Sequence, residues 1–134
     1  MTEGVRQRSV ALILARELAV NLVTPMLVWD EEGTLVYFNE PAQAIIGRSY
    51  EDMADMTVEE LQQFQPTDPD GAPLTMTDMA STIALKDREP AHRVMVITGL
   101  DGVRRRIDVT AYPLLTRGDE FVGAVAIFWE PGEA

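Results

Sequence analysis

The chain has 134 residues, with 22 acidic and 11 basic side chains and a formal net charge of −11. This length is typical of a single domain and leaves no room for a separate output module, and the 46% hydrophobic content is that of an ordinary globular protein. Nucleic acids and anionic membrane surfaces are bound by clustered Lys and Arg, so the acidic charge argues against both as partners. The apolar run from Val10 to Ala15 is too short to span a bilayer, and the chain has no cysteine. Together these features predict a cytoplasmic protein.

Residues 6–23 are predicted to form an amphipathic helix with two apolar sides. One broad stripe consists of Ala11, Leu14, Ala15, Leu18 and Leu22, and a weaker one of Val10, Ile13 and Val20. A helix that only covers its own domain needs a single stripe. The second stripe therefore predicts a partner, namely the same helix of another subunit in a homodimer. The alternative is a helix that lies in a deep groove of its own domain.

Two strands are predicted next, over residues 26–29 and 34–38. Both are short runs rich in β-branched and aromatic residues. Between them, Asp30 and Gly33 supply turn chemistry, so the segment is predicted to be a β-hairpin with a loop slightly longer than two residues.

The hairpin is expected to lead directly into a two-turn helix. Asn39 is a favoured N-cap residue, Pro41 suits the first helical turn, and Gly47 suits a left-handed C-terminal end. Further on, residues 57–64 begin with the spacing of a capping box and are predicted to form a short helix.

The middle of the chain shows helical signals and little strand character. Residues 66–73 have turn residues at almost every position and are predicted to be a loop. A helix capped by Thr75 or Thr77 is expected to run to about Lys86. The acidic segment 68–71 lacks the later ligands of a calcium loop, so no metal site is predicted there.

The last third of the chain is predicted to be all strand, over residues 93–98, 104–115 and 121–129. Ile107, Val109 and Ala111 alternate with polar or large residues, which indicates one buried face. Pro113 is expected at a bulge or an edge position. The order of helix, two strands, short helices and three strands predicts an α+β fold with one antiparallel sheet and helices on one face.

These elements carry the motifs of a known family. The first half reads Trp29-Asp-x-x-Gly33-x-Leu-Val-Tyr-Phe-Asn39-x-x-Ala42-x-x-x-Ile46-Gly47, and the second half contains Asp70-Gly71-x-Pro73-Leu74, Ala84-Leu85, Pro90, Asp101-Gly102-x-Arg104, Ala111-x-Pro113-Leu114 and Gly123. The ordered set resembles PAS domains, the sensors of many bacterial histidine kinases and related signalling proteins. The resemblance implies a five-stranded antiparallel sheet in the order 2-1-5-4-3, short helices that enclose a small cavity on one face, and frequent dimerisation through a preceding helix. It divides the chain into a flanking helix (1–23), a PAS domain (24–130) and a tail (131–134).

The resemblance also allows the cofactors of PAS relatives to be tested. The covalent flavin and pigment types both need a cysteine, and the chain has none. Haem-binding relatives ligate iron through a histidine on or near the long helix, whereas His92 follows Pro90 at the entry of a strand and is expected to point to solvent. Non-covalently bound flavin stays open, so the cofactor is unknown.

Strand alternation in the resembling fold predicts which side chains line the cavity. The candidates are Leu27, Trp29, Val36, Phe38, Ile46, Met76, Met79, Ala80, Ile83, Val94, Val96, Val109 and Ala111. This apolar set, with its adaptable methionines, would suit an apolar ligand such as a fatty acid better than a dicarboxylate. The alternative is that the same side chains simply pack together as core.

The resulting hypothesis is a sensory or interaction module that binds a small apolar ligand or a protein partner and dimerises through residues 6–23. A ligand-free scaffold that regulates a separate effector, such as a kinase, is the alternative. A small α+β enzyme would need a buried ionisable pair, and the inward strand positions offer none. Pro131 and Gly132 stop any helix after the last strand, which predicts that the signal passes to a separate protein or through the N-terminal helix.

Overall fold

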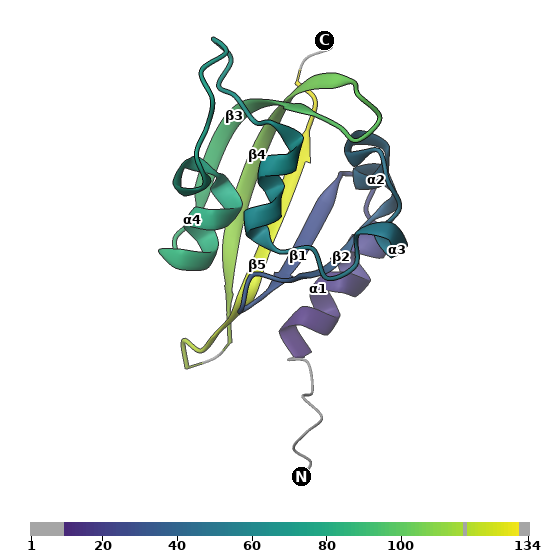
Figure 1. Ribbon diagram of the computed structural model, residues 1–134. Coiled ribbons are helices and arrows are strands. Elements are labelled where there is room, and N and C mark those ends of the chain that lie inside the picture. Colours follow the sequence, from purple (N-terminus) through teal and green to yellow (C-terminus); the bar gives the residue numbers. More distant parts are fainter. Residues whose placement is uncertain (1–9, 117, 132–134) are drawn as a thin grey trace.

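The structure, a computed structural model, describes residues 10–116 and 118–131. Its centre is one antiparallel sheet with five strands in the order β2-β1-β5-β4-β3 (Figure 1). The strands are β1 (Met26–Asp30), β2 (Leu35–Phe38), β3 (Ala91–Thr98), β4 (Arg104–Leu115) and β5 (Phe121–Trp129). The predicted α+β class and strand order are confirmed. The first four residues of the predicted flanking helix and most of the predicted tail lie outside the described residues.

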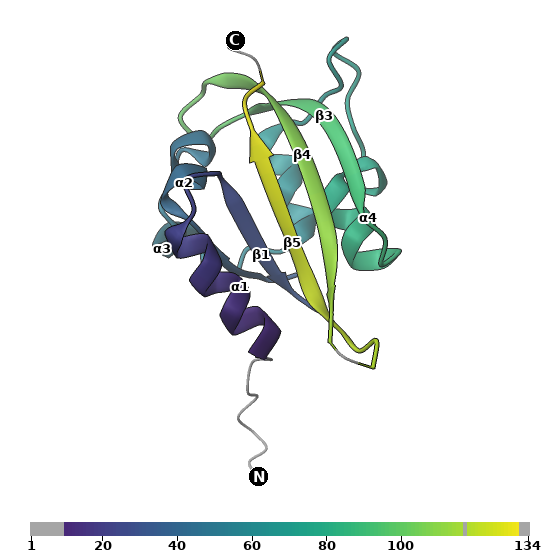
Figure 2. The ribbon, with the colours of Figure 1, turned by 180° about the vertical axis from the view of Figure 1, so that it is seen from behind.

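Helices cover the two faces of the sheet unequally (Figures 1 and 2). One face, here called the inner face, is covered by α2 (Glu40–Ile46), α3 (Tyr50–Met53), the 3₁₀ helices η1 (Val58–Phe64) and η2 (Met76–Asp78), and α4 (Ala80–Lys86). The opposite, outer face carries α1 (Val10–Asn21) over β1, β2 and β5. The main core therefore lies between the sheet and the short helices, and a smaller core lies under α1.

Local sequence chemistry explains the turns and helix ends near the inner face. Oδ1 of Asp30 accepts hydrogen bonds from the backbone N–H groups of Glu32 and Thr34, at 2.9 and 3.0 Å, and thereby shapes the hairpin loop. Asn39 caps α2 by accepting from the N–H of Ala42 at 3.2 Å, and Gly47 ends the helix in the left-handed conformation. These predicted roles of Asp30, Asn39 and Gly47 are confirmed.

The two predicted helices of the middle segment differ from expectation in type. The capping box at Thr57 is present, but the helix that it opens is a 3₁₀ helix. The expected single helix that ends near Lys86 is divided into η2 and α4, because Met79 has an extended backbone and interrupts it.

Pro113 lies in β4 beyond Ala111, the last residue of β4 that pairs with β3, so it occupies the predicted edge position.

The buried side of α1 differs from the predicted stripe. Leu12, Ala15 and Ala19 face the sheet and are buried, whereas Leu14 and Leu18 are 62% and 55% exposed. Of the predicted stripe, Ala15 is buried and Leu22 packs against the smaller core. The prediction was wrong for Leu14 and Leu18, because apolar residues surround the helix and periodicity alone does not select the docked side. The small Ala15 and Ala19 allow the close approach to the sheet, and this tertiary fit decides the rotation of the helix.

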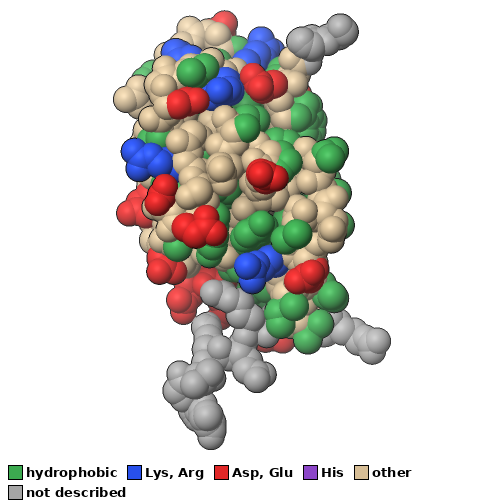
Figure 3. Space-filling view, turned by 90° about the vertical axis from the view of Figure 1, so that its right-hand side faces the viewer, with side chains coloured by type: hydrophobic (Ala, Val, Ile, Leu, Met, Phe, Trp, Pro, Cys, Tyr) green, Lys and Arg blue, Asp and Glu red, His purple; other side chains and the backbone are tan. Residues whose placement is uncertain are grey.

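The surface around α2 and α3 reflects the composition of the chain. Figure 3 shows acidic side chains scattered over this side of the molecule. On α1, the guanidinium carbon of Arg16 lies 4.9 Å from the ring centre of Tyr37. This contact joins α1 to β2.

Candidate functional site

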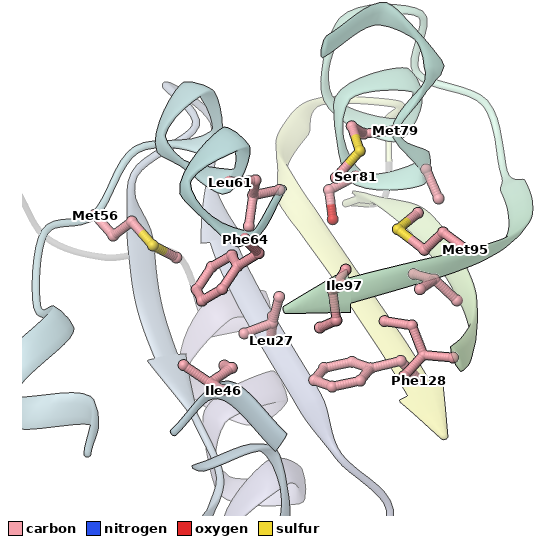
Figure 4. Close-up of a pocket in the computed structure, with 13 residues that line it drawn as sticks. Leu27, Ile46, Met56, Leu61, Phe64, Met79, Ser81, Met95, Ile97 and Phe128 are labelled. Carbon is pink, nitrogen blue, oxygen red and sulfur yellow. The ribbon is translucent and has the colours of Figure 1, made fainter. Parts of the chain in front are cut away.

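A pocket of about 60 Å³ lies between the short helices and the inner face of the sheet (Figure 4). Its walls come from both layers: Ile46 of α2, Met56, Leu61 and Phe64 of the segment around η1, Met79 before α4, Ala80 and Ser81 of α4, and Leu27, Met95, Ile97, Ile107, Val109 and Phe128 of the strands. Apart from the Ser81 hydroxyl, every side chain in the wall is apolar. The pocket is thus suited to an uncharged occupant.

Ten of the thirteen predicted cavity residues divide into three groups. Leu27, Ile46, Met79, Ala80 and Val109 line the pocket. Trp29, Phe38 and Ala111 belong to the same core cluster without reaching the pocket wall, and Met76 packs against that cluster from its edge. Ile83 is only partly buried and belongs to neither core cluster.

The prediction that Val36 faces inward is wrong. In β2, Phe38 pairs with Leu27 and Tyr37 with Val28, but Leu35 pairs with Trp29, so Val36 is an extra residue in the ladder. Such a β-bulge breaks strict alternation. Val36 consequently packs under α1 in the smaller core.

Val94 and Val96 were also assigned to the wrong face. The inner face of β3 carries Met95 and Ile97, which line the pocket. The segment 94–97 is apolar at every position, so its sequence contains no signal for the phase of alternation. Pairing decides the phase, because Met95 lies opposite Ile107 in β4 and cross-strand partners share a face.

Several wall residues were missed by sequence reasoning. Ile107 could have been included, since it alternates with Val109 on one strand. The spacing of Leu61 and Phe64, three residues apart, also places them on one side of a 3₁₀ helix. Nothing in the sequence marks Ser81, because its environment depends on Trp29, 52 positions away.

One hydrogen bond connects the pocket wall to the sheet beneath it. The indole Nε1 of Trp29 donates to Oγ of Ser81 at 3.2 Å, and both residues are buried. The neighbouring Thr82 is buried as well, yet its Oγ1 has no hydrogen-bond partner among the described residues. A buried indole N–H that has a partner stabilises this part of the core, whereas the unpaired hydroxyl costs stability.

Among the described residues, no ionisable side chain lines the pocket. The carboxyl of Asp101 has a lowered pKa because the N–H of Val103 and the side chain of Arg105 donate hydrogen bonds to it. Hydrogen bonds from Thr75 lower the pKa of Asp78 in the same way. Both carboxylates are on the surface. Within the described residues there is no group of three or more His, Cys, Asp or Glu side chains that could hold a metal ion, and His92 is exposed on β3.

This sheet order, with helices that enclose an apolar pocket on one face, defines a sensory type of α+β domain. The family model described as the PAS fold matches residues 15–129, and the chain belongs to the PAS family of sensory domains of signalling proteins. The match begins inside α1, so the predicted boundary at residue 24 stays a prediction. Among curated proteins, none matches the sequence.

Solved structures share the fold at low sequence identity. The PAS domain of BvgS from Bordetella pertussis is 20% identical with a TM-score of 0.62, and the match covers 91% of this chain and 86% of that one. The PAS domain of nitrogen regulation protein NR(II) from Vibrio parahaemolyticus is 17% identical with a TM-score of 0.62, and the match covers 88% of this chain and 98% of that one. The LOV protein of Rhodobacter sphaeroides is 15% identical with a TM-score of 0.72, and the match covers 92% of this chain and 69% of that one. No helix among the described residues has the length and apolar character needed to cross a membrane.

Proposed function

We propose that this PAS domain is a cytoplasmic sensor whose signal is a small apolar molecule bound in the pocket between η1, α4 and the sheet. The observation that supports the proposal is the chemistry of the wall, in which twelve of thirteen side chains are apolar and three are methionines. Methionine has a flexible, unbranched side chain and can adjust to the shape of an occupant. A ligand would thus be held by shape and desolvation rather than by charge.

The size of the pocket limits its occupant. A water molecule needs roughly 10–15 Å³ of accessible volume, so a pocket of about 60 Å³ has room for only a few non-hydrogen atoms. A larger ligand would require Met56, Met79 and Met95 to change rotamers. Binding of a small or of a larger ligand would favour one packing of the helices on the sheet over another, which is how a ligand shifts an existing equilibrium.

We further propose that α1 transmits the signal and that its exposed side forms the contact between the two subunits of a homodimer. Val10, Leu14 and Leu18 are four residues apart along the helix and are 69%, 62% and 55% exposed, so they form an apolar line on the side away from the sheet. The other side of α1 packs on β1, whose alternate residues point toward the pocket side. A separate effector protein, such as a kinase, would respond to the state of this helix.

A ligand-free scaffold is the second candidate. In that case the same exposed line on α1 would bind a partner protein, and the pocket would be an imperfectly packed part of the core that binds no ligand. An enzyme is disfavoured, since PAS domains are generally sensory modules and the pocket wall contains no ionisable side chain. The two leading candidates differ in whether the pocket admits an apolar guest.

Xenon is the probe that separates them, because apolar cavities in proteins bind it. The chain would be labelled with ¹³C at the methionine methyl groups and titrated with xenon under pressure. We expect saturable shifts at Met56, Met79 and Met95 and none at Met26, which is buried in the smaller core under α1. Ala80→Leu, which fills the pocket, should abolish the shifts, whereas Ala54→Leu at an exposed position should not.

Native and denaturing mass spectra of the purified protein, with a visible absorption spectrum, would reveal a ligand that is retained. Absence of xenon shifts at the three methionines, together with an unaltered mass and no colour, would refute the sensor proposal and leave the scaffold.

A further inference from the structure

We infer that the uncovered half of the outer sheet face is the surface on which α1 of a second copy of this chain packs, so that two α1 helices lie side by side between two facing sheets. This inference rests on the homodimer proposed above, because it names the surface that completes that contact.

The outer face of the sheet is covered unequally. α1 lies mainly over β1 and β2 and reaches β5 and part of β4, whereas no helix among the described residues lies over β3 on this face (Figure 2). Alternation with the inner residues and the cross-strand pairing identify the outward side chains of the uncovered half. This half, here called the bare sheet patch, consists of Val94, Val96, Thr110, Tyr112, Ile127 and Trp129.

The bare sheet patch is apolar and adjoins α1. All its members except Thr110 are apolar or aromatic, and Tyr112 and Trp129 are 45% and 39% exposed. Tyr112 lies opposite Val125, which is buried under α1, and Ile127 packs against the same smaller core. Single exposed apolar residues are ordinary, but a contiguous apolar patch marks an interaction site.

A contact between two α1 helices alone is too small for a stable dimer. α1 has 12 residues, so it is about 18 Å long, and a helix with its side chains is about 10 Å wide. Its footprint is therefore roughly 180 Å², whereas a standard interface buries about 800 Å² on each partner. The proposed homodimer needs further surface on the same face of the molecule, and the bare sheet patch supplies it.

The distribution of charge favours a second copy as the occupant. Two chains of net charge −11 repel each other unless near-neutral surfaces meet. The ionisable side chains of α1 are Arg16 and Glu17, which balance each other. On the outward side of β4, Arg104 and Arg106 outweigh Asp108. Neither α1 nor the uncovered half of the sheet therefore carries the negative excess of the whole chain.

A two-fold axis between the subunits gives both unpartnered surfaces a partner at once. Leu12, Ala15 and Ala19 hold α1 on its own sheet, which leaves the exposed line of Val10, Leu14 and Leu18 for the other subunit. An axis parallel to the strands places each α1 over the bare sheet patch of the other subunit and beside the other α1. The contact is then self-complementary, as a two-fold interface requires.

The first test changes the sheet and leaves α1 intact. Tyr112→Glu places a charge in the bare sheet patch, and we expect it to raise the dimer dissociation constant by about tenfold or more, because the carboxylate would lose its hydration in the contact. Val103→Glu is the matched control, since Val103 is also 45% exposed but lies in the loop between β3 and β4. Light scattering over a dilution series measures the dimer, and circular dichroism checks the fold.

The second test leaves the observed subunit unaltered. A nitroxide is attached to Val23→Cys, a position that is 89% exposed just after α1, and this chain is refolded with ¹⁵N-labelled wild type, which has no cysteine. Any broadening of the ¹⁵N signals that depends on the dimer then arises between subunits. We expect the amide signals of Val94 and Thr110 to broaden more than that of Tyr37 in β2.

Each other outcome has a defined meaning. If Leu18→Asp dissociates the dimer and Tyr112→Glu does not, the proposed homodimer stands and this inference is overturned. Stronger broadening at Tyr37 than at Val94 overturns it as well. A monomeric wild type overturns both the homodimer and this inference, whereas the xenon experiment still decides the proposal for the pocket.

Discussion

The side-chain amide of Asn39 donates a hydrogen bond of 3.0 Å to the carbonyl oxygen of Ala19, and thereby joins the start of α2 to the last turn of α1. The same amide donates to the carbonyl of Thr24 at 2.9 Å, while its oxygen accepts from the N–H groups of Met26 and Ala42 at 3.0 and 3.2 Å. Only 1% of Asn39 is exposed. One buried side chain thus connects the flanking helix, the first strand and the helix that contributes Ile46 to the pocket.

Asn39→Ala should destabilise the fold by about 2–4 kcal/mol, because it removes a helix cap and leaves several buried backbone groups unpaired. Urea unfolding followed by circular dichroism measures the change. Ser49→Ala is the matched control, since Ser49 caps only the short surface helix α3, and it should cost no more than about 1 kcal/mol. Equal losses in the two variants would contradict the connecting role of Asn39.

Neighbouring residues of α4 should respond in opposite directions. Thr82→Val removes a buried hydroxyl that has no partner in the described part of the chain, so we expect a gain of about 1 kcal/mol in the free energy of unfolding. Ser81→Ala orphans the Trp29 indole N–H and should lose about 1–2 kcal/mol. Thermal unfolding of both variants checks the pair. A loss in Thr82→Val would mean that its hydroxyl has a partner after all.

Gly123 lies in β5 opposite Asp30, with φ of +151°, and a Cβ built on it would overlap the carbonyl oxygen of Trp29. Gly123→Ala should therefore disturb the β1–β5 ladder and destabilise the fold by more than about 3 kcal/mol. Gly71→Ala is the control, because Gly71 also has positive φ but no described atom would lie within 4 Å of its Cβ. Its expected loss is about 1 kcal/mol. A comparable loss in both variants would show that φ alone, rather than crowding, matters at Gly123.

The carboxylate of Asp101 gives the stability a specific pH dependence. Its pKa in the folded protein is below the ordinary value of 3.8, chiefly because Val103 N–H donates to it and secondarily because Arg105 does. A lowered folded pKa means that the carboxylate stabilises the fold above pH 3.8 and that this contribution disappears as the pH falls through the folded pKa. The difference in unfolding free energy between the wild type and Asp101→Asn should therefore shrink below about pH 4. Urea titrations at pH 7, 5 and 3 measure it, and a constant difference would contradict the assignment.

Leu18→Asp tests the proposed dimer without disturbing the core, because Leu18 is 55% exposed on the side of α1 away from the sheet. We expect light scattering to show a dimer for the wild type and a monomer for the variant, with an unchanged circular dichroism spectrum. Ala54→Asp adds the same charge at an exposed position outside α1 and should leave the dimer intact. A wild-type monomer, or a variant that stays dimeric, would refute dimerisation through this face.

Local interactions made much of the fold predictable. The turn at Asp30, the cap at Asn39 and the left-handed end at Gly47 each depend on contacts within a few residues, and strands β4 and β5 have the predicted bounds. The candidate site was predicted less well. Its location between helices and sheet followed from the resemblance, but Val36, Val94 and Val96 were placed on the wrong face.

The sequence by itself determined the family, the order of the elements, the acidic charge and the apolar character of the pocket, because these follow from residue types and short-range patterns. Only the tertiary structure decided which side of α1 meets the sheet, where β2 bulges at Val36, and which phase of β3 points inward. Each of these choices is made among sides that are similarly apolar, so cross-strand pairing and close packing, not composition, select one of them. The contact between Ser81 and Trp29 likewise depends on the tertiary structure, because the two residues are 52 positions apart in the sequence.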